Sequence, residues 1–105
     1  MFARHVSIKL KANSAPEFNR LIESEILPLL RKQKGFRDEI TLVAPERSLV
    51  LAISLWDTKG DAEAYNRAGY PEVLKGLSKV VEGTPKVETF EVSTSTFYKG
   101  AAKTA

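Results

Sequence analysis

Few side chains in this sequence can transfer a proton near neutral pH. His5 is the only histidine, and its ordinary pKa lies close to neutrality, so it is the first candidate for a general base. Tyr65 is the second, because a buried phenol hydroxyl needs a hydrogen-bond partner that a substrate can supply. The sequence therefore predicts His5 and Tyr65 as catalytic residues, with a structural role left open as the alternative for each.

Four further residues are candidates for the wall of a substrate pocket. Arg4 can face a substrate anion or form an ion pair at the edge of a sheet. Trp56 and Tyr70 can line a cleft between helices and sheet, or can fill the core. Asn66 follows Tyr65 and can hydrogen-bond a ligand, or can lie exposed on a helix surface.

The composition excludes several classes of site. The chain has 105 residues, no Cys and one His, which excludes disulfides, thiol nucleophiles, Cys-based zinc sites and multi-histidine metal clusters. We therefore expect no metal site. The Asp and Glu residues are scattered along predicted solvated faces and do not support paired-carboxylate hydrolysis. No glycine-rich phosphate loop is present.

The charge pattern and hydropathy predict neither a nucleic-acid nor a membrane partner. The net charge is +3, and the densest basic cluster contains Arg31, Lys32, Lys34 and Arg37. This cluster falls at the expected end of a helix, where it complements the negative helix terminus, and no aromatic residues interleave with it. No apolar stretch approaches the ~20 residues of a membrane span, and no signal-peptide core is seen at the N-terminus. We expect a cytoplasmic protein.

The periodicity of apolar residues predicts four strands and three helices in the order β-α-β-β-α-α-β. The first helix is predicted to begin with a capping box between Ser14 and Glu17, to be kinked or split by Pro28, and to stop at Gly35. The predicted strands are 2–11, 36–44, 48–56 and 85–97, and the other two helices are 58–68 and 71–81.

The predicted strand 48–56 is the most informative segment, because it is apolar on both faces. Such a strand is central in its sheet and covered on both sides. The helices of one such chain can cover only one face. We therefore predict an α+β, ferredoxin-like fold, a four-stranded antiparallel sheet with helices on one face, in which a second copy covers the other face in a twofold dimer. Residues 1–98 form the domain, and 99–105 form a flexible C-terminal tail.

Two stretches of the sequence carry a resemblance to a known family. The segments HVSIKLKANSAPEFNRLIESEILPLLRKQKGF and LVLAISLWDTKGDAEAY resemble the antibiotic biosynthesis monooxygenase-like domains, within a match over residues 2–97. The resemblance implies a dimeric α+β barrel. It also implies one of several activities, since some members oxidise polycyclic phenols with dioxygen and no metal or flavin, some degrade haem, and many have no established activity.

The resemblance disfavours haem degradation for this chain. The haem-degrading branch has an Asn on the first strand, a Trp on the second helix and a His further along, and these places are held by Val6, Tyr65 and Lys75. The resemblance thus implies a cofactor-independent monooxygenase acting with dioxygen on a small aromatic or quinol-type compound. The alternative is a non-catalytic dimeric module that binds or senses a small molecule.

Overall fold

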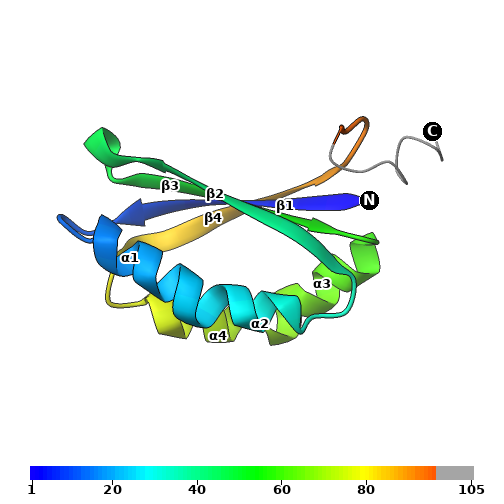
Figure 1. Cartoon of the computed structure of the whole chain (residues 1–105), viewed down its shortest axis with the longest axis horizontal. Helices are drawn as coiled ribbons and strands as arrows, with labels where there is room; N and C mark the ends of the chain where they lie inside the picture. The colour runs from blue at the N-terminus through cyan, green and yellow to red at the C-terminus, as the bar shows by residue number, and fades with distance from the viewer. Residues whose placement is uncertain (97–105) are drawn as a thin grey trace.

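A sheet forms one layer of the molecule, and helices cover one of its two faces (Figure 1). The structure is a computed structural model that describes residues 1–96, so the predicted tail 99–105 lies outside the described residues. The strands are β1 (Phe2–Leu10), β2 (Phe36–Ala44), β3 (Leu49–Trp56) and β4 (Val81–Glu91). The helices are α1 (Ala15–Leu21), α2 (Leu27–Arg31), α3 (Lys59–Ala68) and α4 (Tyr70–Leu77), with a π-helical turn (Ile22–Ile26) between α1 and α2 and a 3-10 turn (Pro45–Arg47) between β2 and β3.

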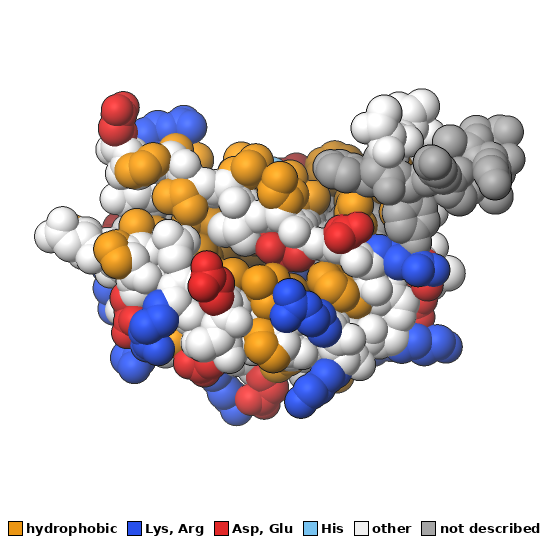
Figure 2. Space-filling view, in the orientation of Figure 1, with side chains coloured by type: hydrophobic (Ala, Val, Ile, Leu, Met, Phe, Trp, Pro, Cys, Tyr) orange, Lys and Arg blue, Asp and Glu red, His pale blue; other side chains and the backbone are white. Residues whose placement is uncertain are grey.

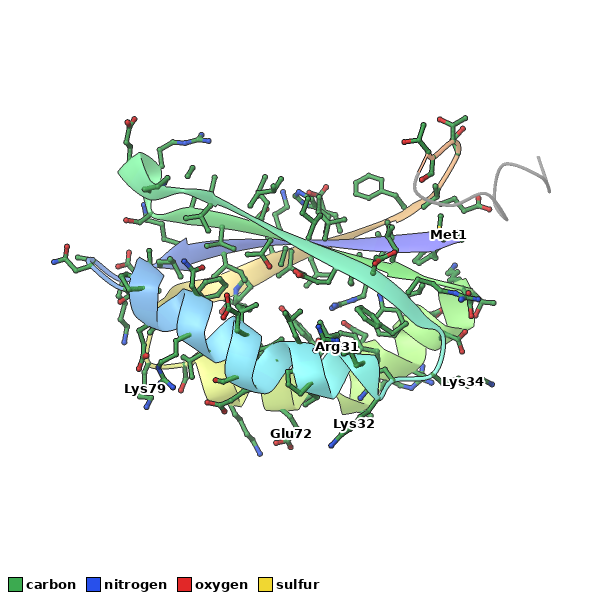
Figure 3. The ribbon with its side chains drawn as sticks, viewed as in Figure 1. Met1, Arg31, Lys32, Lys34, Glu72 and Lys79 are labelled. Carbon is green, nitrogen blue, oxygen red and sulfur yellow. The ribbon has the colours of Figure 1, made fainter. Side chains whose placement is uncertain are left out.

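The four strands lie in the order β2-β3-β1-β4, and every neighbouring pair is antiparallel. This order confirms the predicted ferredoxin-like α+β fold and the central position of β3. Between the sheet and the helices lies a core in which Phe18, Val50 and Trp56 are fully buried. On the outer side of the helical layer, Lys32, Glu72 and Lys79 point away from the sheet (Figure 3).

Pro28 splits the first helical segment, as predicted. The backbone N–H of Leu27 donates to the carbonyl of Ile22, five residues earlier, which is the wider π-type spacing. A proline has no N–H, and its ring clashes with the carbonyl one turn before it in a regular α-helix. The π-helical turn directly before Pro28 widens the backbone at that point, and α2 begins anew with the proline in its first turn.

The predicted capping box at the start of α1 is wrong. Ser14 makes no side-chain hydrogen bond to the helix, and its backbone (φ −99°, ψ −2°) is outside the extended region that brings a capping hydroxyl to the free N–H groups. Glu17 instead accepts a hydrogen bond from Arg20 at 2.6 Å. At the start of α3 the cap does form, because Thr58 is extended and its Oγ1 accepts from the N–H of Asp61 at 3.1 Å.

The predicted boundary between the last helix and the last strand is also wrong. The helix was expected to continue to residue 81, but α4 ends at Leu77 and β4 already begins at Val81. Val81 pairs with Leu10 of β1, so strand pairing outweighs the helical spacing of its side chain. Gly83 and Pro85 do not break β4, because it is an edge strand with a register shift in its pairing to β1. β4 ends at Glu91, before the predicted end at residue 97, which itself is not described.

The second face of the sheet carries apolar side chains that no described helix covers. Ile40 and Leu42 of β2 and Phe90 of β4 are 46%, 45% and 53% exposed. Leu51 and Ile53 of β3 lie directly beside Leu42 and Ile40 on this face and are partly buried. Hydrophobic side chains are visible along this upper side of the molecule in Figure 2. We call this surface the open sheet face.

Gly35 and Gly83 provide a matched test of the turn before β2. Both have positive φ, at 79° and 72°. A Cβ on Gly35 would meet the carboxylate of Asp61 and lie 2.7 Å from its Cβ, whereas a Cβ on Gly83 would have nothing within 4 Å. Both G35A and G83A introduce a left-handed backbone strain of about 1–2 kcal/mol. We expect G35A to lower the free energy of unfolding by at least about 1 kcal/mol more, because of overpacking. Urea denaturation measures both losses, and equal losses would contradict the packing of Asp61 on Gly35.

Candidate functional site

A cavity of about 50 Å³ lies between the sheet and the helical layer. Its wall is largely aliphatic, with side chains from β1, the π-helical turn, α2 and α4. Figure 3 shows side chains from the sheet and from the helices meeting in this region. Four large polar or charged side chains interrupt the apolar wall, namely Arg4, Glu39, Tyr65 and Tyr70. We call this space the inner cavity.

Arg4 is a buried cation held by neutral partners. Its side chain is 3% exposed, and Nη2 donates to Oδ1 of Asn66 at 2.8 Å. Its Cζ lies 5.0 Å from the ring centroid of Tyr65 and 4.5 Å from that of Tyr70, within the range of a cation–π interaction. Among residues 1–96, Arg4 forms no ion pair with a carboxylate. Aromatic faces and one amide therefore compensate its charge.

Burial lowers the pKa of Arg4, and the two neighbouring tyrosines act in the opposite direction. An arginine nevertheless stays protonated at any physiological pH. A positive charge is therefore fixed in a region of low dielectric, where an oxyanion interacts with it more strongly than in water. Arg4 also lines a second hollow of about 210 Å³, between α3 and the strands β1 and β4.

Tyr65 lies at the centre of an aromatic cluster. It is 4% exposed, and its ring stacks on Trp56 with centroids 4.9 Å apart and an interplanar angle of 26°. Burial raises the pKa of Tyr65 to about 12, with smaller upward effects from Tyr70 and Glu39 and a downward one from Arg4. The Tyr65 hydroxyl is therefore protonated at neutral pH, so it can donate a hydrogen bond and does not act as a ready base.

Glu39 is the site residue that sequence reasoning missed. It lines the inner cavity from β2, and its Oε2 accepts a hydrogen bond from Oγ1 of Thr41 at 2.7 Å. Burial raises the pKa of Glu39, and the hydrogen bond from Thr41 partly offsets this effect. Alternation along β2 was the available signal, because it places Glu39 on the face of Thr41 and Val43, opposite Ile40 and Leu42.

The sheet register aligns the charged residues of the cavity on one row. Arg4 of β1 lies opposite Ser54 of β3, and Ser54 lies opposite Glu39 of β2. Residues directly opposite one another in antiparallel strands point to the same face, so all three face the helices. Ser54, in the middle, is 6% exposed, and its Oγ accepts from Nε1 of Trp56 at 2.9 Å. A polar row thus crosses a sheet face on which the neighbouring positions of β1 and β3, such as Val6, Ala52 and Trp56, are apolar.

The structure brings together three of the predicted site residues and separates the others. Arg4, Tyr65 and Tyr70 line the inner cavity. Trp56 is fully buried behind Tyr65 and does not line it. Asn66 is exposed on α3 and reaches the site only through its hydrogen bond to Arg4.

His5 lies on the other side of the sheet. It follows Arg4 in β1, and alternation points it to the open sheet face, where it is partly buried and paired in register with Ile53 and Glu88. Within one chain, His5 and Tyr65 therefore do not meet in a common cavity.

Two further features bear on ligands and membranes. In the part of the chain that the structure describes, no three His, Asp or Glu side chains are grouped so that they could hold a metal ion. No helix within residues 1–96 has the length and apolar character that crossing a bilayer requires.

Comparisons with known proteins identify the fold. No protein-family model and no curated protein matches the sequence. A protein of unknown function from Nitrosomonas europaea has a TM-score of 0.76 at 17% identity, over 90% of this chain and 90% of its own. A candidate antibiotic biosynthesis monooxygenase from Deinococcus radiodurans has a TM-score of 0.73 at 17% identity, and the match covers 90% of this chain and 95% of that protein. The haem degrader MhuD from Mycobacterium tuberculosis, with two haems in its active site, has a TM-score of 0.74 at 15% identity. The match covers 90% of this chain and 98% of MhuD.

These likenesses confirm the predicted resemblance at the level of the fold. Sequence identities below one fifth carry no statement about activity in this chain.

The variant E39Q tests the burial of the Glu39 carboxylate. Because burial raises its pKa in the folded state, ionising Glu39 destabilises the native protein. This destabilisation is absent below the ordinary pKa of about 4.3 and grows as the pH rises through the folded-state pKa. Gln cannot ionise but can still accept the hydrogen bond from Thr41. We therefore expect the Tm of E39Q, relative to native protein, to increase from acidic to neutral pH in thermal unfolding.

The control for this measurement is E23Q, at an exposed position on the π-helical turn. Its Tm relative to the native protein should change little over the same pH range. A difference between E39Q and native protein that shrinks as the pH rises would show that Glu39 is not buried as described.

Proposed function

We propose that this chain, which has the fold of proteins named as candidate antibiotic biosynthesis monooxygenases, is a cofactor-independent monooxygenase. Its substrate in this proposal is a small aromatic or quinol-type compound, and its co-substrate is dioxygen. The observation that carries the proposal is the inner cavity, an apolar space in which a protonated tyrosine and a buried arginine face the same volume.

The size of the inner cavity favours a single small ring. By the measure in which one water needs about 10–15 Å³, its roughly 50 Å³ corresponds to about four waters. A single aromatic ring is of this order, whereas a tetrapyrrole is much larger. The residues at the haem-branch positions, Val6, Tyr65 and Lys75, supply no histidine ligand. Haem degradation is therefore not the activity that we propose.

The proposed chemistry needs little from the protein. Tyr65 donates a hydrogen bond to a substrate oxygen, and the charge of Arg4 stabilises the substrate as an anion. The aliphatic wall keeps water away from that electron-rich anion, which can then reduce dioxygen directly. In the keto tautomer of a phenol one ring carbon is a CH₂: one oxygen atom becomes its carbonyl and the other leaves as water with the two hydrogens, so no further reductant is needed.

We also propose that a second copy of the chain covers the open sheet face. Apolar surface of a few hundred Å² contributes several kcal/mol when it is removed from water, at about 25 cal/mol per Å². Ile40, Leu42 and Phe90 are the most exposed large apolar residues on this face. A twofold packing of sheet on sheet buries them in both copies. The two functions then lie on different sides of the sheet, with catalysis under the helices and assembly on the open face.

Dioxygen consumption tests the proposed activity. Hydroquinones and other single-ring phenols are added to the purified, chelator-treated protein, and uptake is followed with an oxygen electrode. We expect uptake with at least one compound, and we expect Y65F to reduce it about 100-fold, because one hydrogen-bond donor to the reacting oxygen is lost. K75A, at an exposed position on α4, should retain native activity.

Three outcomes would count against the activity or its location. If no compound supports uptake, the oxygenase proposal fails and the non-catalytic binding module is favoured. If Y65F equals the native protein, the inner cavity is not the reaction site. If H5A loses activity while Y65F retains it, the reaction takes place at the open sheet face.

The dimer has its own test in light scattering at micromolar concentration. The native protein should show twice the mass of a single chain. L42K places a charge in the open sheet face and should give single chains, whereas A64K, on an exposed position of α3, should leave the mass unchanged. A native protein with the mass of one chain would refute the proposed assembly.

A further inference from the structure

Arg4 and Glu39 are opposite charges in one cavity that do not form an ion pair. Both line the inner cavity, and no ion pair of the described residues includes either of them. Arg4 is buried and Glu39 is partly buried. Opposite charges that share such a space normally pair, because each is costly to remove from water alone. In this chain Arg4 is held by Asn66 and two aromatic rings, and Glu39 by Thr41. Each charge is thus positioned by neutral groups, and the space between them is left for a third group.

We propose that the inner cavity binds an aromatic ring with an acidic hydroxyl at one end and an oxygen acceptor at the other, and that Glu39 accepts the hydroxyl proton while Arg4 holds the negative charge. This inference rests on the proposed function for its site and names the substrate class and a catalytic residue that the sequence did not indicate.

The spacing between the strands fits a ligand that carries an oxygen at each of two opposite ends. Arg4 and Glu39 lie on one row with β3 between them, so their Cα atoms are about 10 Å apart, or two strand spacings. Side chains on one row extend in the same direction, toward the helices. A single ring with oxygens at opposite ends, and a hydrogen bond at each end, spans a distance of the same order.

The proton transfer balances in atoms and charge. The O–H bond of the ligand breaks, the proton moves to a carboxylate oxygen of Glu39, and the electron pair stays on the ligand. Conjugation through the ring places part of that negative charge on the oxygen at the opposite end, where Arg4 donates to it. The cavity then contains a neutral carboxyl group, a guanidinium and an anion in place of a carboxylate, a guanidinium and a neutral ligand.

This charge balance selects a phenol over an aromatic carboxylate. A neutral phenol leaves the net charge of the cavity unchanged when it binds and when it ionises. A carboxylate ligand brings an extra negative charge toward Glu39 in a region of low dielectric, which is unfavourable. On the side of the inner cavity, the groups beside Glu39 are the neutral hydroxyls of Thr41, Ser54 and Tyr65, which is consistent with a proton acceptor. On its outer side, Glu39 borders a surface hollow that Arg31, Arg37 and Asp38 also line.

Asn66 is the positioning residue for Arg4. Its Oδ1 accepts from Arg4 at 2.8 Å, and its side chain lies on the exposed surface of α3. The variant N66D keeps the shape of the side chain but provides Arg4 with a carboxylate partner. This variant changes an exposed side chain and leaves the buried Arg4 in place. It therefore tests the role of Arg4 without the loss of folding that removing Arg4 itself could cause.

The probe for this test is 4-nitrophenol, in which a hydroxyl and a nitro group occupy opposite ends of one ring. Its anion absorbs visible light and its neutral form does not, so the spectrum reports the proton directly. The measurement is made without turnover, at a pH where the free compound is mostly neutral. We expect excess native protein to produce the anion band. We expect only a weak anion band with 3-nitrophenol, whose groups are not at opposite ends of the ring. 4-Nitroanisole, which has no hydroxyl proton to lose, should give no anion band and serves as the negative control.

Two variants assign the roles. E39Q should bind 4-nitrophenol in its neutral form, without the anion band. N66D should raise the Tm, because Arg4 gains an ion pair, and should weaken formation of the anion about tenfold or more, because the ligand then competes with a carboxylate. K75A should match the native protein.

The proposal is overturned if native protein does not bind 4-nitrophenol, binds it only as the neutral form, or produces the same band in E39Q. It is also overturned if N66D raises the Tm without weakening the band, since Arg4 would then be purely structural. These results are independent of dioxygen uptake. Anion formation without uptake would refute the oxygenase and retain the binding site, and uptake without anion formation would do the reverse.

Discussion

A guanidinium buried without a carboxylate partner is the constraint around which this molecule is arranged. Arg4 lies on the helix-covered face of a central strand, where a charge is costly unless its surroundings compensate it. The compensation comes from Tyr65, Asn66 and Tyr70, which all lie in the α3–α4 segment. The close packing of this segment on β1 therefore determines the shape of the inner cavity. Trp56 supports the α3–α4 segment by stacking on Tyr65.

The two faces of the sheet differ in what covers them. The described helices cover one face only, and apolar side chains of the other face are exposed in a single chain. Alternation along β1 sends Arg4 into the inner cavity and His5 to the open sheet face, although they are adjacent in sequence. The proposed chemistry, which depends on a buried charge, and the proposed assembly, which depends on exposed apolar area, therefore involve opposite faces of the sheet.

Much of the fold could be predicted because it depends on local patterns. The alternation in β1, the apolar faces of β3 and the effect of Pro28 on the first helix are readable from neighbouring residues. The errors arose where tertiary pairing outweighed local preference. Val81 has helical spacing in the sequence but pairs with Leu10 of β1, and Ser14 has the right side chain for a cap but the wrong backbone.

The sequence by itself determined the order of elements, the one-sided helical cover and the presence of Arg4, Tyr65 and Tyr70 on faces that can meet. Only the tertiary structure decided that Glu39 joins them, because membership in the site depends on the register between β2, β3 and β1. Register is a property of paired strands and is not encoded in the alternation of any one strand. For His5, the most obvious base in the sequence, alternation along β1 already separates it from Arg4, and the fold decides which of the two faces the helices cover.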